Sequence, residues 1–362
     1  MSITLGSTAP SQITLNLDDV FAQSLANYQK EMIDNIGKEL PFLFMLLASG
    51  QYQGTDGGTD LRGPLMYAMN TMDSYDGYDE MGVLPTEGVT QWVDEWRQCA
   101  TPIVYSMKEV IQNARQIVDF VETRIKQAEM GIHEGWSDAF FTGAGATSAA
   151  LLRTPKTSPI NGSSYFNPIG KLIDYVPTNS STVHNINQFT YSWWRNLIKA
   201  SSATTGDGLL SECLTFYNTL GLKTGGKPEL MICDQTTHEL LTQAYFQRFR
   251  ATQTDNNFPF ENIRLRNARI VMESAVNDVY TPAAGTDTKG TIYYMNMKYF
   301  RVKYINGRNF EMLKDENGKT FVKPNNGDSR LGHLAWMGQV ICNQRRKQGV
   351  HGNIARTLTF SV

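Results

Sequence analysis

Apolar residues recur every three or four positions over about residues 17–38, a spacing that predicts an amphipathic helix. Gly37 and then Pro41 end this pattern, as expected at a helix C-terminus. Residues 1–16, by contrast, are polar and show no periodicity. We therefore expect a loose N-terminal arm followed by a helix.

The same three-to-four spacing continues without a proline from Met107 to about Phe141. At 1.5 Å per residue this stretch predicts a helical rod of about 50 Å, much longer than a typical globular helix. One side of the rod is expected to contact the core through Ile117, Val121, Ile125 and Ile132.

Between these helices the pattern changes to short β-type runs. LPFLFMLLAS at 40–49 is apolar but far below the roughly 20 residues of a membrane span, so it predicts a buried segment. LMYAMN at 65–70 and VTQWVDEW at 89–96 predict two strands. An acidic, glycine-containing turn joins them, and the whole predicts an extended hairpin.

The second half of the chain alternates irregularly between helical and strand patterns after a linker at 143–159. DENGK at 315–319 predicts a hairpin turn. The order indicates an α+β fold rather than a regular βαβ alternation. Helices are predicted for YSWWRNLIKA, GLLSECLTFYNTLGL and, after a threonine cap, TTHELLTQAYFQRFR; strands are predicted for PELMICD, ARIVMESA, TIYYMN and KYFRVKYI.

Composition narrows the possible functions. The 362 residues carry a net charge of only −2, which does not favour a nucleic-acid-binding or membrane-surface protein. No secretory signal pattern opens the sequence, and the four cysteines form no CxxC pair, so we expect a reducing compartment. The five histidines lie far apart, and we expect each to be solvated or hydrogen-bonded rather than a metal ligand.

The acidic stretch MDSYDGYDEMG at 72–82 is the strongest candidate for site chemistry. It fails the EF-hand template, because the third and fifth positions counted from Asp73 are Tyr75 and Gly77. Paired catalytic carboxylates would need burial, which a glycine-containing surface turn does not supply. Phosphate-loop and nucleophile-elbow patterns are also incomplete, so we predict no catalytic residue, cofactor or metal.

Two basic clusters and a tryptophan pair could serve either the folded structure or contact with nucleic acid. The clusters are predicted to be solvated surface or partners of acidic groups, with phosphate contact as the alternative. Trp193 and Trp194 are adjacent, so on a helix they would point about 100° apart. We expect one to enter the core and the other to meet a neighbouring element rather than to stack on bases. The clusters are Arg264, Arg266 and Arg269, and Arg345, Arg346 and Lys347.

This order of elements resembles the major capsid proteins of tailed bacteriophages, which have the Hong Kong 97-type fold. The resemblance covers essentially the whole chain and includes LDDVFAQSLANYQKEMIDNI, GPLMYAMN, TPIVYSMKEVIQNA and SWWRN. It implies an N-terminal arm, an extended E-loop hairpin, a peripheral (P) domain with a long spine helix, and an axial (A) domain. The implied ranges are 1–50 for arm and helix, 51–99 for the E-loop, 100–160 with 290–345 for the P domain, and 161–289 with 346–362 for the A domain.

The resemblance implies a structural protein, not an enzyme, that forms the hexamers and pentamers of an icosahedral phage head enclosing double-stranded DNA. It further implies assembly in the host bacterial cytoplasm, with a separate scaffolding protein, a portal and a decoration protein as partners. The packaged DNA would be contacted weakly and no membrane would be involved. A tail or baseplate protein, or a metal-dependent or carbohydrate-active hydrolase, remains as an alternative. Some members crosslink subunits through an E-loop lysine, but residues 54–97 contain no lysine.

Charge along the chain adds one hypothesis about subunit contacts. Residues 54–97 hold nine acidic residues and two arginines, a net charge of 2 − 9 = −7. Residues 329–362 hold five basic residues and no acidic one, a net charge of +5. We expect the acidic loop to contact the basic segment of an adjacent subunit. The residues expected at this contact are Asp73, Asp76, Asp79, Glu80, Arg345, Arg346 and Lys347.

Overall fold

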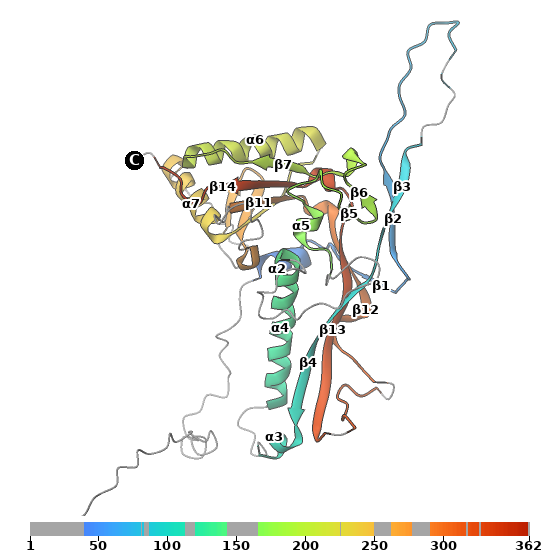
Figure 1. The fold of residues 1–362 in the computed structure, drawn as a ribbon, viewed down its shortest axis with the longest axis vertical. Coiled ribbons are helices and arrows are strands. Elements are labelled where there is room, and N and C mark those ends of the chain that lie inside the picture. The colour runs from blue at the N-terminus through green and yellow to red at the C-terminus, as the bar shows by residue number, and fades with distance from the viewer. Residues whose placement is uncertain are drawn as a thin grey trace, which may run out of the picture.

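The chain builds two packed sheets, a long helix and a projecting hairpin (Figure 1). This α+β arrangement is the class predicted from the element order. The computed structural model describes residues 40–80, 82, 87–112, 120–142, 166–224, 226–249, 262–276, 290–315, 318–325 and 327–360. The predicted arm and helix at 1–39 and the linker at 143–159 lie outside these residues.

A six-stranded mixed sheet forms one end of the molecule, with strand order β7-β14-β11-β8-β10-β9. Helices α6 (Gly206–Thr224) and α7 (Gln235–Phe249) cover one of its faces. The strands are β7 (Leu197–Ala200), β8 (Leu230–Cys233), β9 (Asn262–Leu265), β10 (Ala268–Met272), β11 (Gly290–Met295) and β14 (Gly349–Ile354).

The sequence of β8 shows why this sheet is covered on both faces. All four of its residues are apolar and buried, a pattern typical of strands that pack on two sides. Because side chains alternate along a strand, Leu230 and Ile232 join the core cluster that contains Phe42 and Phe140. Met231 and Cys233 join the cluster that contains residues of α6 and α7.

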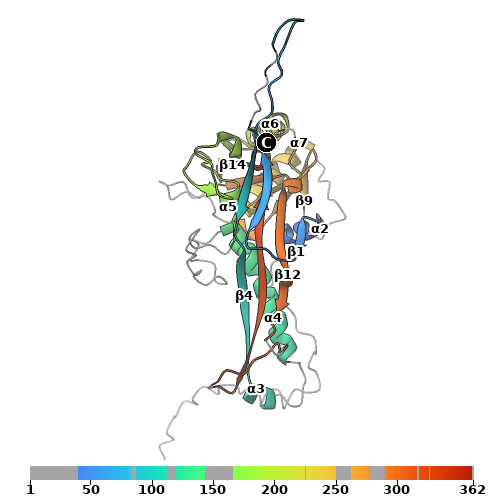
Figure 2. The ribbon, with the colours of Figure 1, turned by 90° about the vertical axis from the view of Figure 1, so that its right-hand side faces the viewer.

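A second, four-stranded sheet runs along the long axis of the molecule (Figure 2), with strand order β1-β12-β13-β4. The long helix α4 (Phe120–Thr142) packs on it through Trp136, whose ring contacts Phe166 and Trp336. α3 (Met107–Gln112) precedes α4, and residues 113–119 between them are outside the described part. The strands are β1 (Tyr52–Thr55), β4 (Arg97–Ser106), β12 (Phe300–Met312) and β13 (Ser329–Cys342).

The predicted core-facing side of the long helix is confirmed within Phe120–Thr142, the part that the structure describes. Ile132 is buried, Ile125 is partly buried against the same cluster and Val121 is half-buried, whereas Ile117 lies outside the described residues. The apolar run after residue 39 forms α2 (Pro41–Ala48). Phe42 of α2 stacks on Phe140 of α4 with ring centroids 4.7 Å apart, so this run belongs to the core rather than to an arm.

β2 (Leu61–Met66) and β3 (Val89–Asp94) pair antiparallel and confirm the predicted extended hairpin. The first strand starts four residues earlier than the sequence pattern indicated. The hairpin projects beyond the rest of the chain (Figures 1 and 2). Smaller elements pack near its base: α5 (Ile169–Leu172), β5 (Thr182–Val183), β6 (Ile186–Asn187), η1 (Ser192–Trp194), and η4 (Arg345–Lys347). η2 (Ser274–Val276) and η3 (Met297–Tyr299) complete the described elements.

Three expectations need correction. YSWWRNLIKA is not a helix, because only Ser192–Trp194 forms a 3-10 turn and Leu197–Ala200 is β7, paired in parallel with β14. The cap of α7 is Asp234 and not a threonine, since its carboxylate accepts hydrogen bonds from the backbone N–H and the hydroxyl of Thr237. β11 belongs to the six-stranded sheet, so a domain boundary at residue 290 does not follow the sheets.

The other helices and strands predicted for the second half of the chain are confirmed. The apolar patterns over 208–222 and 236–250 are α6 and α7, and the four predicted strands are β8, β10, β11 and β12. At the predicted turn, the backbone N–H of Asp315 donates to the carbonyl of Lys319 at 2.9 Å. Among the described helices, none has the length and apolar character needed to cross a membrane.

Candidate assembly surface

The base of the projecting hairpin has a small core of its own. Trp92 of β3 packs there with Trp194 and Ile341, and all three side chains are buried. The indole N–H of Trp194 donates to the carbonyl of Val183 at 3.1 Å, so its one polar atom is satisfied. Gly63 of β2 lies directly against Trp92, where a Cβ atom would come within 2.6 Å of the indole ring. The hairpin is therefore held to the body by close aromatic packing at one end only.

A buried polar network also fastens the hairpin base. Asp94, the last residue of β3, accepts hydrogen bonds from His184 Nδ1 at 2.6 Å and from Asn167 Nδ2 at 2.5 Å. The other ring nitrogen of His184, Nε2, accepts the backbone N–H of Cys342 at 3.1 Å. These two partners require a neutral imidazole with its proton on Nδ1. Burial alone would raise the pKa of Asp94, but the hydrogen bonds from His184 and Asn167 outweigh it and lower the pKa.

Trp193 and Trp194 behave as the sequence predicted for adjacent aromatic residues. Trp194 is buried in the hairpin-base core, whereas Trp193 is half-buried and meets a neighbouring element. The Trp193 ring stacks on Tyr67, just beyond β2, with centroids 5.2 Å apart and planes 18° apart. This aromatic stack supports the hairpin at the point where it leaves the body.

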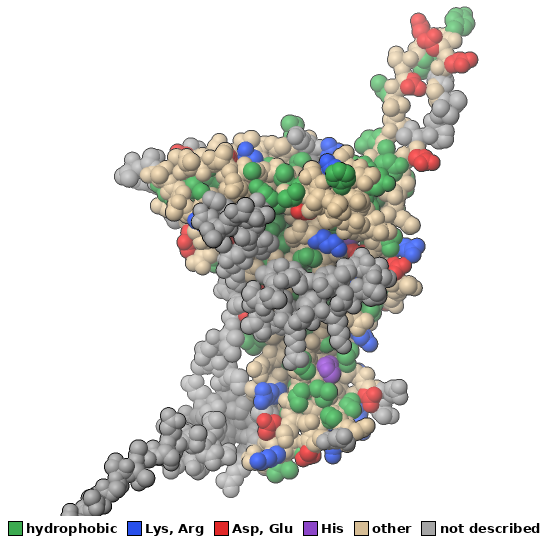
Figure 3. Space-filling model, in the orientation of Figure 1, with side chains coloured by type: hydrophobic (Ala, Val, Ile, Leu, Met, Phe, Trp, Pro, Cys, Tyr) green, Lys and Arg blue, Asp and Glu red, His purple; other side chains and the backbone are tan. Residues whose placement is uncertain are grey.

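Beyond this stack the hairpin exposes both acidic and apolar side chains (Figure 3). Asp73, Asp76, Asp79 and Glu80 are all exposed. Asp73 and Asp79 accept only local backbone N–H groups, from Gly82 at 3.3 Å and Asp76 at 3.0 Å. Within the described residues no three histidine, cysteine or acidic side chains are placed to hold a metal ion. Among the described residues of the hairpin, the exposed apolar ones are Met66, Tyr67, Met69, Met72, Tyr75, Tyr78 and Val89.

A groove separates the hairpin base from the turn between β13 and β14. It has a cavity volume of about 290 Å³ and brings the hairpin next to the predicted basic cluster. Arg346 is exposed, while Lys347 is half-buried and donates from Nζ to the hydroxyl of Tyr299 at 2.8 Å. That hydrogen bond lowers the pKa of Tyr299. The groove is lined by Leu65, Met66, Tyr67, Ala68, Met69, Trp193, Trp194 and residues 343–347.

Arg345 does not have the role expected from the sequence. Its side chain is 0% exposed, and its guanidinium is used entirely within the chain. It donates to the carbonyls of Leu172 at 2.7 Å, Trp194 at 3.3 Å and Lys171 at 3.2 Å. Further bonds reach the side-chain oxygens of Gln188 and Asn196. A guanidinium so enclosed cannot reach an acidic loop on another subunit, so Arg345 leaves the set of candidate contact residues.

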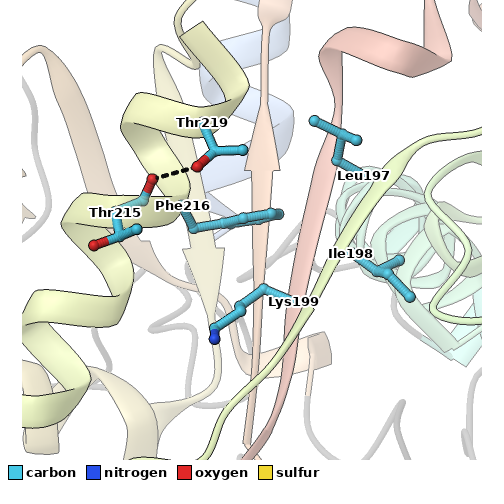
Figure 4. A pocket seen from close by; sticks show the side chains of 6 residues that line it. All are labelled: Leu197, Ile198, Lys199, Thr215, Phe216 and Thr219. Carbon is cyan, nitrogen blue, oxygen red and sulfur yellow. Dashed lines mark hydrogen bonds between the residues drawn. The ribbon is translucent and has the colours of Figure 1, made fainter. Parts of the chain in front are cut away.

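A second hollow lies between β7 and α6 (Figure 4) and has a volume of about 170 Å³. Its polar groups offer little to a ligand, because the Thr219 hydroxyl donates to the carbonyl of Thr215 and the Thr215 hydroxyl to that of Ser211. Lys199 supplies the only charge among the six lining residues.

Beside this hollow, Cys213, His351 and Glu212 are arranged like a nucleophile, a base and an orienting carboxylate. The thiol lies 3.8 Å from His351 Nδ1, and His351 Nε2 lies 3.3 Å from the Glu212 carboxylate. However, burial raises the pKa of the Cys213 thiol to about 12. Cys213 and His351 are both fully buried, so the cluster is part of the packed interior.

Sequence reasoning missed the Asp94–His184 pair, whose members are 90 positions apart. One local signal was available, since the stretch VHNI places two turn-forming residues between β-branched ones. His184 and Asn185 both have positive φ angles, 51° and 63°, and form the turn between β5 and β6.

Comparison with known proteins shows similarity in structure alone. No family model matches the sequence, and no curated protein matches it. The capsid asymmetric unit of cyanophage A-1(L) is similar with a TM-score of 0.62 at 12% identity, covering 91% of this chain and 97% of that one. The capsid of Myoviridae phage XM1 gives 0.54 at 9% identity, covering 92% of this chain and 98% of that one.

A third similar structure is an encapsulin complex. The holo-SrpI encapsulin complex of Synechococcus elongatus gives a TM-score of 0.53 at 11% identity and covers 95% of this chain and 98% of that one. Together the three similarities show that the chain has the Hong Kong 97-type capsid fold expected from the order of its elements.

Proposed function

We propose that this chain is a major capsid protein, which assembles as hexamers and pentamers into an icosahedral phage head that encloses double-stranded DNA. The observation that carries the proposal is the projecting hairpin. Met69, Met72 and Tyr78 have exposed fractions of 81%, 96% and 105%. Apolar side chains gathered on one exposed element mark an interaction surface. The described residues of a single subunit leave them uncovered, and a neighbouring copy supplies the cover.

The anchoring of the hairpin supports the same role. Only its base is packed, by Trp92, Trp194 and the Asp94–His184 pair, so it emerges from the body in a set direction. A long arm held rigidly at one end reaches across a neighbour at a defined angle. Repeated by rotation, such a head-to-tail contact closes into a ring. The fold shared with two phage capsid structures supports a capsid role.

The partners and location follow from this proposal. The protein's main partner is itself, in a shell assembled in the host bacterial cytoplasm and retained in the virion. A separate scaffolding protein and a portal assist assembly, and a decoration protein is a further partner. The net charge of −2 suits a container that contacts DNA weakly. The role is structural, without a catalytic step.

Negative-stain electron microscopy of the purified recombinant protein tests the proposal. Closed, uniformly sized icosahedral shells are expected, whereas rings or tubes would indicate a tail or baseplate protein. Soluble monomers at all concentrations would overturn the proposal. Because an encapsulin shares the fold, nucleic acid must also be assayed in particles recovered from the natural source. Particles that contain a protein cargo and no DNA would refute the phage-head assignment.

A matched pair of variants makes the test specific to the hairpin. Replacing Met69 and Met72 with serine removes apolar surface that the folded subunit leaves exposed, so the melting temperature should stay unchanged while shell yield falls. Leu222 on α6 is also 88% exposed and serves as the control. Leu222→Ser should leave both the melting temperature and the shell yield unchanged.

A further inference from the structure

We propose that the hairpin tip of one copy docks into the groove between the hairpin base and the β13–β14 turn of the next copy, with Tyr75 and Tyr78 entering the groove and the tip carboxylates pairing with Arg346 and Lys347. This inference rests on the proposed function and specifies which surfaces meet. It is carried by the shape of the groove, by its charge and by the chemistry of the tip.

The groove has room and chemistry for an aromatic side chain. Its volume of about 290 Å³ exceeds the roughly 150 Å³ of a cavity that takes up benzene. Tyr67 and Trp193 line it with aromatic rings, and Met69 adds a thioether, a side chain that adapts its shape and packs well on rings. The tip offers Tyr75 and Tyr78, which are 62% and 105% exposed.

Charge complementarity selects the same pair of surfaces. In the described part of the chain, neither Arg346 nor Lys347 forms an ion pair with an acidic side chain, although both line the groove. The tip carries four exposed acidic residues between 73 and 80, and none of them forms an ion pair among the described residues. The acidic, aromatic tip and the basic, aromatic groove thus form no ion pair with each other within the described part of one subunit. Matching them between subunits sets the register of docking more than it adds affinity.

The occupant is a second copy because the chain's own tip is too far away. Nine residues separate Tyr67, at the groove, from Asp76 at the tip. In the extended hairpin each residue advances about 3.3 Å, so the tip lies about 30 Å from its own groove. The tip points away from the body in both views (Figures 1 and 2). Each subunit therefore offers its tip to one neighbour and its groove to another, as a closed ring of five or six requires.

Site-directed disulfide formation tests the contact in the full chain. Ser74→Cys places a thiol in the tip and Gln344→Cys places one at the groove, and both positions keep every charged and aromatic residue named above. The two single variants are mixed, allowed to assemble and then oxidised. We expect a covalent dimer on non-reducing gels, and a ladder up to five or six chains from the double variant. Since the dimer joins two different chains, contact within a chain cannot produce it.

The control replaces the groove cysteine with Leu222→Cys on α6, where an exposed thiol should give at most a tenth of the dimer. If shells form but Gln344→Cys crosslinks no better than Leu222→Cys, the docking is wrong while the capsid role stands. Crosslinked rings without closed shells would support the docking and refute the capsid role. Neither rings nor shells would refute both.

Charge reversal gives an independent readout. Asp76→Lys with Asp79→Lys should lower assembly at least tenfold at low salt, and Arg346→Glu with Lys347→Glu should do the same. Mixing the two reversed proteins should restore rings of six, because in alternating order each reversed tip meets a reversed groove and each natural tip meets a natural groove, whereas a ring of five keeps at least one mismatched contact. Combining all four changes in one chain should restore assembly. Failure of this combined variant, with melting temperatures unchanged, would contradict the pairing.

Discussion

Replacing Arg345 with methionine is expected to destabilise the folded subunit by about 4 kcal/mol. The guanidinium is fully buried and donates five hydrogen bonds, three of them to backbone carbonyls. Burial lowers its pKa to about 10, so the group still carries its charge at neutral pH. Methionine has a similar length but no donor, and it leaves these acceptors buried without a partner.

The size of this loss of stability follows from the hydrogen-bond acceptors that Arg345→Met leaves without a donor. A buried acceptor left without its partner costs about 1–3 kcal/mol. Asn196 Oδ1 keeps a second donor, the N–H of Asp174 at 3.0 Å, so four acceptors lose the one partner that they have among the described residues. Taking the low end of the range gives about 4 kcal/mol, in line with the roughly 3–5 kcal/mol for breaking a buried charged network. Arg345→Lys keeps the charge but can satisfy at most three acceptors, so about half of this loss is expected.

The assay is thermal unfolding of the unassembled subunit, followed by far-ultraviolet circular dichroism. An unfolding entropy of about 2.1 cal/mol/K per residue gives about 0.8 kcal/mol/K for 362 residues. A loss of about 4 kcal/mol then lowers the melting temperature by about 5 °C, and the lysine variant by about half as much. If both variants melt within 1 °C of the natural protein yet fail to assemble, Arg345 acts between subunits and the reasoning from burial is wrong.

Three further predictions concern buried groups. Glu273 is buried against the N-terminus of α2, and burial raises its pKa to about 7. Its contribution to the free energy of unfolding is therefore fully present below about pH 4.5, where the carboxyl is protonated, and is lost as the pH rises through 7. Glu273→Gln should therefore raise the melting temperature by about 4 °C at pH 8.5 and by nothing at pH 4; a uniform change at both pH values would contradict this. Burial lowers the pKa of His351 to about 4, so the free energy of unfolding should fall by up to about 3 kcal/mol as the pH drops from 6.5 to 4. In melting curves measured over this pH range, His351→Gln should show a smaller fall. An equal fall in the variant would show that other groups are responsible. Ile132→Asp buries a charge on the core side of α4 and should yield insoluble protein, whereas Glu129→Ala on its exposed side should stay soluble and assemble, as judged by sedimentation.

The elements that the sequence predicted correctly are those whose signal lies within a few residues. α6 and α4 carry apolar residues at helical spacing, and the four apolar residues of β8 indicate a doubly covered strand. The glycine and aspartate residues between two strand patterns predicted the acidic turn of a hairpin, and the family resemblance implied that this turn is the tip of an extended loop. Amphipathic periodicity is a local property, so one sequence suffices to read it.

The errors concern segments whose state depends on distant partners. Leu197–Ala200 is a strand because β14, about 150 residues later, pairs with it, and nothing within YSWWRNLIKA reports that pairing. Arg345 looked like surface because it stands beside Arg346 and Lys347. Tertiary structure buried it by bringing carbonyls from residues 171, 172 and 194 to its guanidinium.

The sequence by itself thus determined the segments whose helix or strand pattern is complete within a few residues, and the acidic turn that joins the two strands of the hairpin. Only the tertiary structure decided which polar groups are satisfied inside the subunit and which remain for a neighbour. Asp94 meets His184 across 90 residues, and the N–H of Phe42 meets Glu273 across 231. The physical reason is that a hydrogen bond needs its two atoms within about 3 Å, a condition that chain folding sets and local spacing does not encode.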